Sequence, residues 1–265
     1  MVFIKVCRLI ALAAALICAV FFVVVASLLD SLARRPLTLS WCAQRWYRLL
    51  LGILNVRVTL VGLAPQQGVL ICSNHISWLD IPVIGSRLTT AFLAKAELRA
   101  LPLLGWLAHR AGTLFIQRGG GQSDQINRSI QGYLTQNRCL TFFPEATTGN
   151  GYAIRQFHPR LFAAAIGTGT PVLPLALQYQ TGAQGTLEIG FGDESLAENL
   201  WRILGRWRTD VSIQLLPVIQ TEQLQRKALA AEAMHQIADV LNLPTERRGL
   251  NFRAPLPAAL PVDPF

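Results

Sequence analysis

The chain has 265 residues, and its 24 lysines and arginines against 15 aspartates and glutamates give a formal net charge of +9 at neutral pH. Apolar residues make up 52% of the sequence and charged residues only 15%, whereas an ordinary soluble domain has about 25% charged residues. This composition excludes a disordered chain, because disordered sequences are poor in apolar residues. An apolar and basic chain is instead typical of a protein that works at an anionic membrane surface.

The positive charge is concentrated in the first half of the chain. Residues 1–144 contain 14 basic and 4 acidic residues, a net charge of +10, while residues 145–265 contain 10 basic and 11 acidic residues, a net charge of −1. Most of the basic residues are arginines, whose planar guanidinium binds phosphate and carboxylate groups through paired hydrogen bonds. Nucleic acid and anionic lipid both suit such a surface, and the N-terminal segment decides between them.

The N-terminal segment is long and apolar enough to enter a membrane. Leu9 to Leu29 is a run of 21 residues without a charged side chain, which as a helix would extend about 30 Å, the thickness of a bilayer core. A cleaved signal peptide is the alternative, although the run is long for one. A nucleic-acid-binding protein has no use for this segment, so we expect no nucleic-acid partner and instead expect anionic membrane lipids.

A second helix is predicted over Leu37–Val56, where Trp41, Trp46 and Tyr47 stand among arginines and leucines. Tryptophan, tyrosine and arginine together are typical of the headgroup level of a membrane, although an amphipathic helix packed on a soluble core has a similar pattern. Residues 1–56 are therefore predicted to be a membrane-anchoring two-helix segment. The basic residues after the apolar run favour the cytoplasmic face of the inner membrane. If the two helices form a hairpin in one leaflet, that comparison of charges loses its meaning.

From residue 57 onward, short strands alternate with helices, which predicts an α/β sheet flanked by helices. The predicted strands are Val58–Val61, Val69–Ser73, Thr90–Ala94, Thr113–Ile116, Cys139–Phe143, Val172–Gln178, Leu187–Phe191 and Val211–Leu216. The predicted helices are Trp78–Gly85, Leu103–Ala111, Asp124–Asn137, Pro159–Gly167, Leu196–Arg206 and Thr221–Leu241. We expect one domain over residues 57–248, followed by a proline-rich, poorly ordered tail at 249–265.

The turn after the predicted strand Val69–Ser73 contains a histidine and an aspartate five residues apart, His75 and Asp80. On a continuous helix five residues rotate about 500°, which leaves the two side chains roughly 140° apart. They can meet only if His75 lies in the turn and Asp80 lies in the first turn of the next helix. In that arrangement His75 is a general base, and Asp80 fixes its tautomer and stabilises the imidazolium.

Two other interpretations of this segment stay open. Ser77 is a natural N-cap with Asp80 three residues later, so Asp80 can complete a capping box while His75 is an ordinary loop histidine. Ser73 or Ser77 is a weaker candidate nucleophile, because neither lies in a G-x-S-x-G turn.

Four segments in chain order add weight to the catalytic interpretation. The first is N-H-x-x-x-x-D, matched by Asn74, His75 and Asp80, and a K-x-E-L stretch at residues 95–98 follows it. The other three segments are F-I-Q-R at 115–118, F-P-E-A-T at 143–147 and V-L-P-L at 172–175. Together they resemble the glycerolipid acyltransferase family, which includes 1-acylglycerol-3-phosphate acyltransferases. The resemblance covers roughly residues 69–178 and implies that family's mixed sheet flanked by helices.

The third segment departs from the family pattern F-P-E-G-T-R-S. Ala146 stands in place of a glycine, and Thr148 stands in place of the arginine that helps to bind substrate phosphate in the family. Similar Thr-Thr variants resemble enzymes that act on other lysolipids, including lyso-ornithine lipid. The departure leaves the fold and the chemistry as expected but opens the question of the acceptor.

The resemblance implies transfer of an acyl group from a thioester, acyl-CoA or acyl carrier protein, to a lysolipid hydroxyl. The other histidines of the chain do not form a metal-ligand spacing, so we expect no catalytic metal, and we expect no resident cofactor. The first expected acceptor is 1-acyl-glycerol-3-phosphate, and the alternatives are lyso-ornithine lipid and other lysophospholipids. The implied catalytic residues are His75 and Asp80, and the implied substrate-binding residues are Asn74, Arg118, Glu145, Thr147 and Thr148. A solvated charge at Arg118 and a structural hydrogen-bond acceptor at Glu145 are the plainer roles.

Two alternative functions of another class stay open. One is a membrane-anchored hydrolase, and the other is a non-catalytic membrane protein on the same scaffold. Trp201, Arg202 and the run Arg206-Trp207-Arg208 form a basic aromatic cluster, either a second contact with lipid or a packed helix with solvated arginines.

Overall fold

The computed structural model describes residues 2–33, 40–116, 123–149, 151–180, 189–191 and 194–246. The α-helices are α1 Val2–Ala33, α2 Ser40–Ile53, α3 Asp80–Arg87, α4 Leu104–Arg110, α5 Ser123–Leu134, α6 Phe162–Thr168, α7 Leu196–Leu204 and α8 Arg226–Leu241, with 3₁₀ turns η1 Ala96–Ala100 and η2 Pro159–Leu161. The strands are β1 Val56–Val61, β2 Leu70–Ser73, β3 Ala91–Lys95, β4 Leu114–Ile116, β5 Leu140–Phe142, β6 Ile154–Arg155, β7 Val172–Tyr179, β8 Thr209–Leu215 and β9 Thr245–Glu246.

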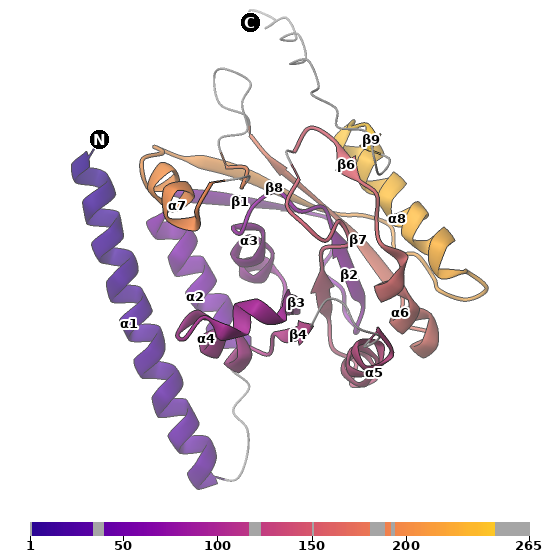
Figure 1. Ribbon diagram of the computed structural model, residues 1–265, viewed down its shortest axis with the longest axis horizontal. Coiled ribbons are helices and arrows are strands. Elements are labelled where there is room, and N and C mark those ends of the chain that lie inside the picture. The colour runs from indigo at the N-terminus through magenta and orange to yellow at the C-terminus, as the bar shows by residue number, and fades with distance from the viewer. Residues whose placement is uncertain are drawn as a thin grey trace, which may run out of the picture.

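A seven-stranded sheet forms the centre of the molecule, in the order β1-β8-β7-β2-β5-β3-β4 (Figure 1). Strands β7, β2, β5, β3 and β4 are parallel to one another, and β8 pairs antiparallel with β7 before β1 pairs parallel with β8. Strands β2 and β7 are buried along nearly their whole length, which explains their unbroken apolar sequences. The sheet is therefore mixed, as expected from the family resemblance.

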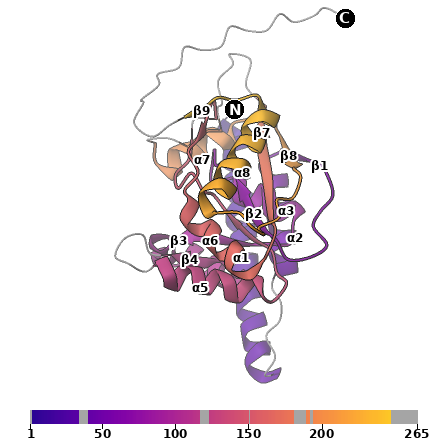
Figure 2. The same ribbon diagram turned by 90° about the vertical axis from the view of Figure 1, so that its right-hand side faces the viewer.

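Helices cover both faces of the sheet, and each face has its own hydrophobic core. One core packs α5, α6 and α8 against the sheet, with Phe142 and Phe162 at its centre. The other packs α2, α3 and α7 against the opposite face, around Leu79, Ile84 and Leu175. Figure 1 shows the two helical layers on either side of the sheet, and Figure 2 shows the molecule from the side of α8.

Helix α1 lies outside the second layer and packs along α2, α4 and α7 (Figure 1). By length and composition, its residues Val2–Ala26 are long and apolar enough to cross a membrane. Only 11% of the most apolar stretch within them is buried. Its last turns extend beyond the rest of the described domain in both views (Figures 1 and 2). The chain thus has the N-terminal apolar helix predicted from its sequence.

The sequence predicted most of the elements, with differences at their ends. Helix α8 begins at Arg226 and not at Thr221, because the preceding residues form a turn in which Gln223 has a left-handed backbone, φ 64°. The strand predicted at Leu187–Phe191 is wrong in its described part, since residues 189–191 are a turn and a loop; residues 187 and 188 lie outside the described residues. The predicted tail at 249–265 also lies outside them.

Candidate active site

The two central parallel strands bring His75 and Glu145 together. Strands β2 and β5 are neighbours, and Cys72 is paired with Phe142. His75 and Glu145 each follow three residues after that pair, so both lie just beyond the carboxyl ends of adjacent strands. In open α/β sheets this edge is where ligands bind.

The His75 ring is held from two sides. Its Nδ1 lies 2.8 Å from Oδ2 of Asp80, and its ring stacks on Phe143 with centroids 4.0 Å apart and planes 15° apart. The His75 side chain is 18% exposed while the Asp80 side chain is fully buried. If Nδ1 carries the proton that Asp80 accepts, Nε2 has a lone pair that can take a proton, which is what a general base requires.

Asp80 receives more hydrogen bonds than the one from His75. Its Oδ2 also accepts from the backbone N–H groups of Ile76 at 2.7 Å and Ser77 at 3.0 Å, and its Oδ1 accepts from the Tyr179 hydroxyl at 2.8 Å. These donors make a buried carboxylate tolerable, because an unpaired charge there would be costly. They also fix Asp80 in one orientation, and Asp80 in turn orients His75.

Only one of the two hydrogen bonds of the expected capping box is present, and Ser77 is not the N-cap. Helix α3 begins at Asp80 with Leu79 as its N-cap and without a capping side chain, so Asp80 is the first helical residue. Asp80 does accept from the Ser77 N–H, but the Ser77 hydroxyl accepts from Leu79 at 3.4 Å. The Ser73 hydroxyl donates to the Asn74 carbonyl at 3.1 Å. Neither serine is bonded to His75, which removes support for a serine nucleophile.

Glu145 is buried, 5% exposed, under the same loop. Its Oε1 accepts from the His75 backbone N–H at 2.9 Å and its Oε2 accepts from the Arg155 N–H at 3.3 Å. Burial raises the pKa of Glu145 to about 8; the two backbone hydrogen bonds and the Arg155 charge lower the pKa, and the Asp80 charge raises it. Glu145 therefore fixes the backbone at His75.

Asn74 fastens the catalytic loop to the neighbouring strand β7. Its side-chain Nδ2 donates to the Leu177 carbonyl at 3.0 Å, and its Oδ1 accepts from the Leu177 N–H at 2.8 Å. The side chain is buried. This pair of bonds continues the ladder between β2 and β7 by one residue and sets where the loop leaves the sheet.

The loop after Glu145 lies beside the His75 loop, where the Gly149 N–H donates to the His75 carbonyl. Ala146 has a left-handed backbone, φ 66°, which costs a non-glycine residue about 1 kcal/mol and explains why the family pattern has glycine there. The Thr148 hydroxyl donates to the Phe191 carbonyl at 2.7 Å, while Thr147 is exposed. The Phe191 N–H in turn donates to the Ile76 carbonyl, so the segment around Phe191 joins this loop to the His75 loop.

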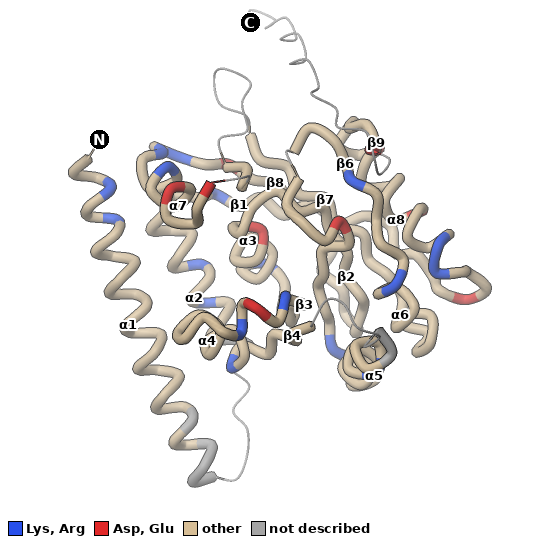
Figure 3. Tube along the Cα trace, viewed as in Figure 1, with Lys and Arg blue, Asp and Glu red and all other residues tan. Residues whose placement is uncertain are grey.

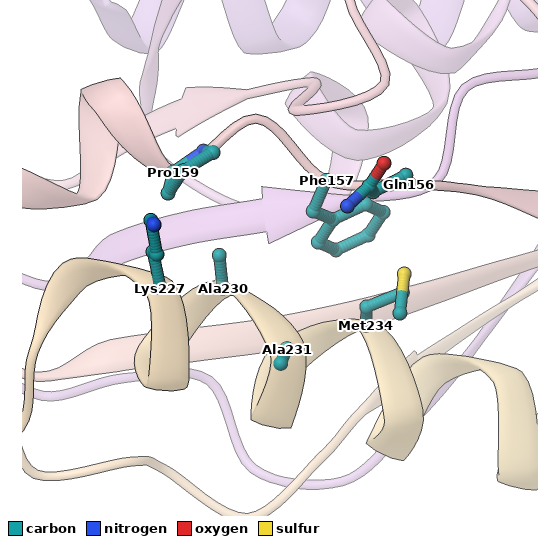
Figure 4. Close-up of a pocket in the computed structure, with 7 residues that line it drawn as sticks. All are labelled: Gln156, Phe157, Pro159, Lys227, Ala230, Ala231 and Met234. Carbon is teal, nitrogen blue, oxygen red and sulfur yellow. The ribbon is translucent and has the colours of Figure 1, made fainter. Parts of the chain in front are cut away.

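Arg118 lies outside the described residues, so its expected contact with the acceptor headgroup stays a prediction. Within the described ranges, no group of three or more histidine, cysteine, aspartate and glutamate side chains could hold a metal ion. A separate groove lies between residues 156–159 and α8 (Figure 4). It is lined by Gln156, Phe157, Pro159, Lys227, Ala230, Ala231 and Met234, none of which is a predicted site residue.

Two side chains of the site were not predicted from the sequence. Phe143 belongs to the F-P-E segment, and its position two residues before Glu145 was a signal that it lies near His75. Tyr179 has no such signal, because it is 99 residues from Asp80 in the chain. Only the pairing of β7 with β2 brings it to the carboxylate.

A buried carboxylate bonded to a partly exposed imidazole, at the carboxyl edge of a mixed sheet, is an arrangement that suits general-base catalysis. Comparison with known proteins gives the class. Residues 55–178 match the Acyltransferase family. A lyso-ornithine lipid O-acyltransferase of Pseudomonas aeruginosa is 42% identical over 205 residues, which cover 77% of this chain and 78% of that protein. A 1-acyl-sn-glycerol-3-phosphate acyltransferase of Neisseria gonorrhoeae is 33% identical over 197 residues, covering 72% and 77% respectively.

The chain belongs to this acyltransferase family and is an O-acyltransferase with a lysolipid acceptor. The fold agrees with that of a solved structure, the 1-acyl-sn-glycerophosphate acyltransferase PlsC from Thermotoga maritima. The match has a TM-score of 0.68 at 19% sequence identity and covers 91% of this chain and 94% of that chain. The family and the mixed α/β fold predicted from the sequence are both confirmed.

Proposed function

We propose that the protein moves a fatty acyl group from an acyl thioester directly to the free hydroxyl of a membrane lysolipid, with His75 as general base. The observation that carries this proposal is the 2.8 Å contact between His75 Nδ1 and Asp80 Oδ2, because it engages Nδ1 and so assigns the role of base to Nε2. His75 is partly exposed, whereas the carboxylate behind it is buried. The imidazole is thus positioned to exchange a proton with a bound substrate.

In the proposed reaction Nε2 of His75 takes the acceptor hydroxyl proton as the oxygen attacks the thioester carbonyl carbon. The new C–O ester bond forms, the C–S bond breaks, and the thiolate takes the proton back from the imidazolium. Asp80 stabilises the imidazolium in between. The oxyanion needs hydrogen-bond donors, and these are not the N–H groups of His75, Ile76 and Ser77, which already donate to Glu145 and Asp80.

The other predicted residues have supporting parts in this proposal. Asn74 and Glu145 position the backbone of the catalytic loop, through the contacts with Leu177 and with the His75 N–H. Thr147 and Thr148 form the wall of the site beside that loop, and Arg118 binds the acidic part of the acceptor.

The test of the base is His75→Ala, with His235→Ala on the exposed surface of α8 as the matched control. The first change should abolish transfer of labelled acyl groups and leave vesicle binding unchanged, while the control keeps its activity. Retained transfer in His75→Ala would disprove the role of base. Release of free fatty acid at the same rate with and without lysolipid would point to a hydrolase.

Lyso-ornithine lipid is the acceptor that we propose, ahead of 1-acyl-glycerol-3-phosphate. The Pseudomonas lyso-ornithine lipid enzyme is more similar to this chain than the Neisseria enzyme, at 42% against 33% identity. At the position where the family pattern has a phosphate-binding arginine, Thr148 instead donates to a backbone carbonyl. A site without that guanidinium has less to offer a phosphate monoester.

An acceptor panel tests this proposal with the purified protein in detergent. We expect the highest kcat/KM with lyso-ornithine lipid and a low value with lysophosphatidic acid. Thr148→Arg should raise the value for lysophosphatidic acid, while Thr147→Arg, next to it but exposed, should not. A preference of the wild type for lysophosphatidic acid would overturn the proposal. Running the panel with both acyl-CoA and acyl carrier protein identifies the donor.

The two N-terminal helices are proposed to anchor the enzyme in one leaflet of the inner membrane, at its cytoplasmic face. Arg8 donates to backbone carbonyls at the end of α7, so the start of α1 lies beside the catalytic domain and not on the other side of a bilayer. Labelling of a cysteine introduced at either end of α1 by a membrane-impermeant reagent, in intact cells and in inverted vesicles, tests the side.

A further inference from the structure

Two exposed tryptophans stand at the end of α7, outside the catalytic site. Trp207 is 80% exposed and Trp201 is 43% exposed. Arg202 and Arg208 flank them, and we refer to these four residues as the α7 edge. Large exposed aromatic side chains of this kind are enriched where one end of the ring is in apolar surroundings and the other end is wet.

The α7 edge is fixed to the two N-terminal helices. Arg8 of α1 donates to the carbonyls of Leu204 and Arg206, and Asn55, just after α2, donates to the carbonyl of Trp207. The Lys5 ammonium lies over the Trp201 ring, 4.8 Å from its centroid. The edge must therefore keep a constant position relative to the first turns of α1, wherever these lie in the membrane.

The outer surface of α1 stays apolar up to its first turn. Val2, Phe3, Val6 and Ile10 are 67%, 80%, 42% and 64% exposed. The only basic residues in the described part of α1, Lys5 and Arg8, instead turn toward α7, and Figure 3 shows the rest of the helix free of basic residues. Between Arg8 and Asp30, α1 has no charged side chain, so its apolar surface can contact lipid up to the level of the α7 edge.

The charges of the α7 edge are balanced within the protein. Arg202 forms an ion pair with Glu194, and Arg208 lies 2.7 Å from Asp210. Paired arginines lose less free energy than unpaired ones on leaving bulk water. Insertion of the two indole rings then buries apolar surface. We therefore expect the affinity for the membrane to come mainly from this buried area and not from attraction to anionic lipid headgroups.

We propose that the α7 edge is a second membrane contact, in which Trp207 and Trp201 insert at the headgroup level of the leaflet that holds α1. The inference rests on the membrane anchoring proposed above. A second contact would also fix how the domain is rotated about its N-terminal anchor. Trp78 lies between His75 and Asp80 in the chain, and its indole N–H donates to Asn199 of α7 at 2.9 Å. Seating α7 on the membrane thereby orients the catalytic loop toward the lipid.

The test uses the full chain in phosphatidylcholine vesicles that carry bromine on the acyl chains, either near the headgroup or near the bilayer centre. Bromine quenches tryptophan fluorescence at short range. We expect stronger quenching by the shallow bromine, and Trp207→Phe should lower the quenched fraction. The matched control adds Leu63→Trp to Trp207→Phe. Leu63 is 92% exposed and follows the end of β1 that lies away from Asn55 and Trp207. A tryptophan at this position should restore the total fluorescence but not the quenched fraction.

Unchanged quenching in Trp207→Phe, or equal quenching of a tryptophan at position 63, would overturn the proposal. The measurement needs no substrate, so it is independent of the proposed reaction. His75→Ala should be quenched like the wild type even though it is inactive. As a second readout, Trp207→Ala should lower kcat/KM for lysolipid in vesicles and leave kcat/KM in detergent micelles unchanged.

Discussion

At the residue scale, the site consists of a chain of hydrogen bonds with one accessible end. Tyr179 donates to Asp80, Asp80 accepts from His75, and only the His75 side chain of the three has appreciable exposure. Because each buried member has its partners, the ring of His75 is held without strain in a single orientation. An imidazole held in this way needs little reorganisation to act as the proposed base.

Removal of the Tyr179 hydroxyl tests this chain. Tyr179→Phe leaves Oδ1 of Asp80 without its donor in a buried site, which should lower the free energy of unfolding by about 1–3 kcal/mol. The value of kcat should fall while KM for both substrates changes little, because Tyr179 acts through Asp80 and does not touch substrate. Steady-state kinetics and denaturant unfolding in detergent measure both effects. Tyr133→Phe, on the half-buried surface of α5, is the control and should leave kcat unchanged.

The raised pKa of Glu145 predicts that the free energy of unfolding depends on pH. Its pKa is about 8 in the folded protein against an ordinary value of 4.5, chiefly because of burial. Between these values the folded state holds a proton that the unfolded state has lost, so the free energy of unfolding falls as the pH rises from about 4.5 to about 8. Below pH 4.5 the contribution is complete.

Unfolding by denaturant at pH 5, 6.5 and 8 measures this contribution when the wild type is compared with Glu145→Gln. The wild type should lose stability relative to the variant as the pH rises, since glutamine does not titrate. Parallel pH profiles of the two proteins would show that Glu145 is ionised throughout.

At the element scale, the first helix is held to the domain at a helix end. The last carbonyls of a helix have no partner within it, and the guanidinium of Arg8 satisfies those at the end of α7. A cation there is also favoured by the dipole of α7. The positive charge at the start of the chain, which in the sequence suggested membrane topology, thus has a structural partner.

Arg8→Ala should weaken the docking of α1. Loss of hydrogen bonds to a charged donor should lower the free energy of unfolding by about 1.5–3 kcal/mol. Arg8→Lys keeps the charge but not the planar fork, so it should restore part of the loss and separate the charge from the geometry. Denaturant unfolding in detergent compares the three proteins. Equal stability of Arg8→Ala and the wild type would show that α1 is held by its apolar contacts alone.

At the scale of the whole molecule, the catalytic domain owes little of its core to the anchor. Among the α1 side chains that the structure describes, the buried apolar ones are Ala15 and Ala26, and Leu12 packs at the edge of the second core. The buried residues of both core clusters all come after position 50. The outer surface of α1 is exposed and apolar along its length. Folding and anchoring are thus largely separate tasks in this chain.

Deletion of residues 2–33 tests that separation. The shortened protein should keep its circular dichroism and a cooperative unfolding transition, while its co-flotation with phosphatidylglycerol vesicles falls sharply. Transfer to detergent-dispersed lysolipid should persist at a reduced level. Loss of cooperative unfolding would mean that α1 is part of the folding unit, and unchanged co-flotation would place the main anchor elsewhere. His75→Ala in the full chain controls for vesicle binding without activity.

The sequence by itself determined what depends on residues near one another. Apolar runs predict the anchor helix and the buried strands, since a segment's burial follows from its own side chains. The spacing of His75 and Asp80 predicts their contact, because a turn followed by a helix start allows only a few geometries. The pair Thr147 and Thr148 opens the question of the acceptor by itself, because a threonine stands where the family pattern has an arginine.

The tertiary structure decided everything that depends on strand order. Glu145 lies under His75 because β5 is next to β2, and Tyr179 reaches Asp80 because β7 is on the other side of β2. The antiparallel insertion of β8, the absence of a strand at residues 189–191, and the docking of Arg8 on α7 have no local signal either. Strand pairing is set by the free energy of packing the whole sheet, which no short segment contains.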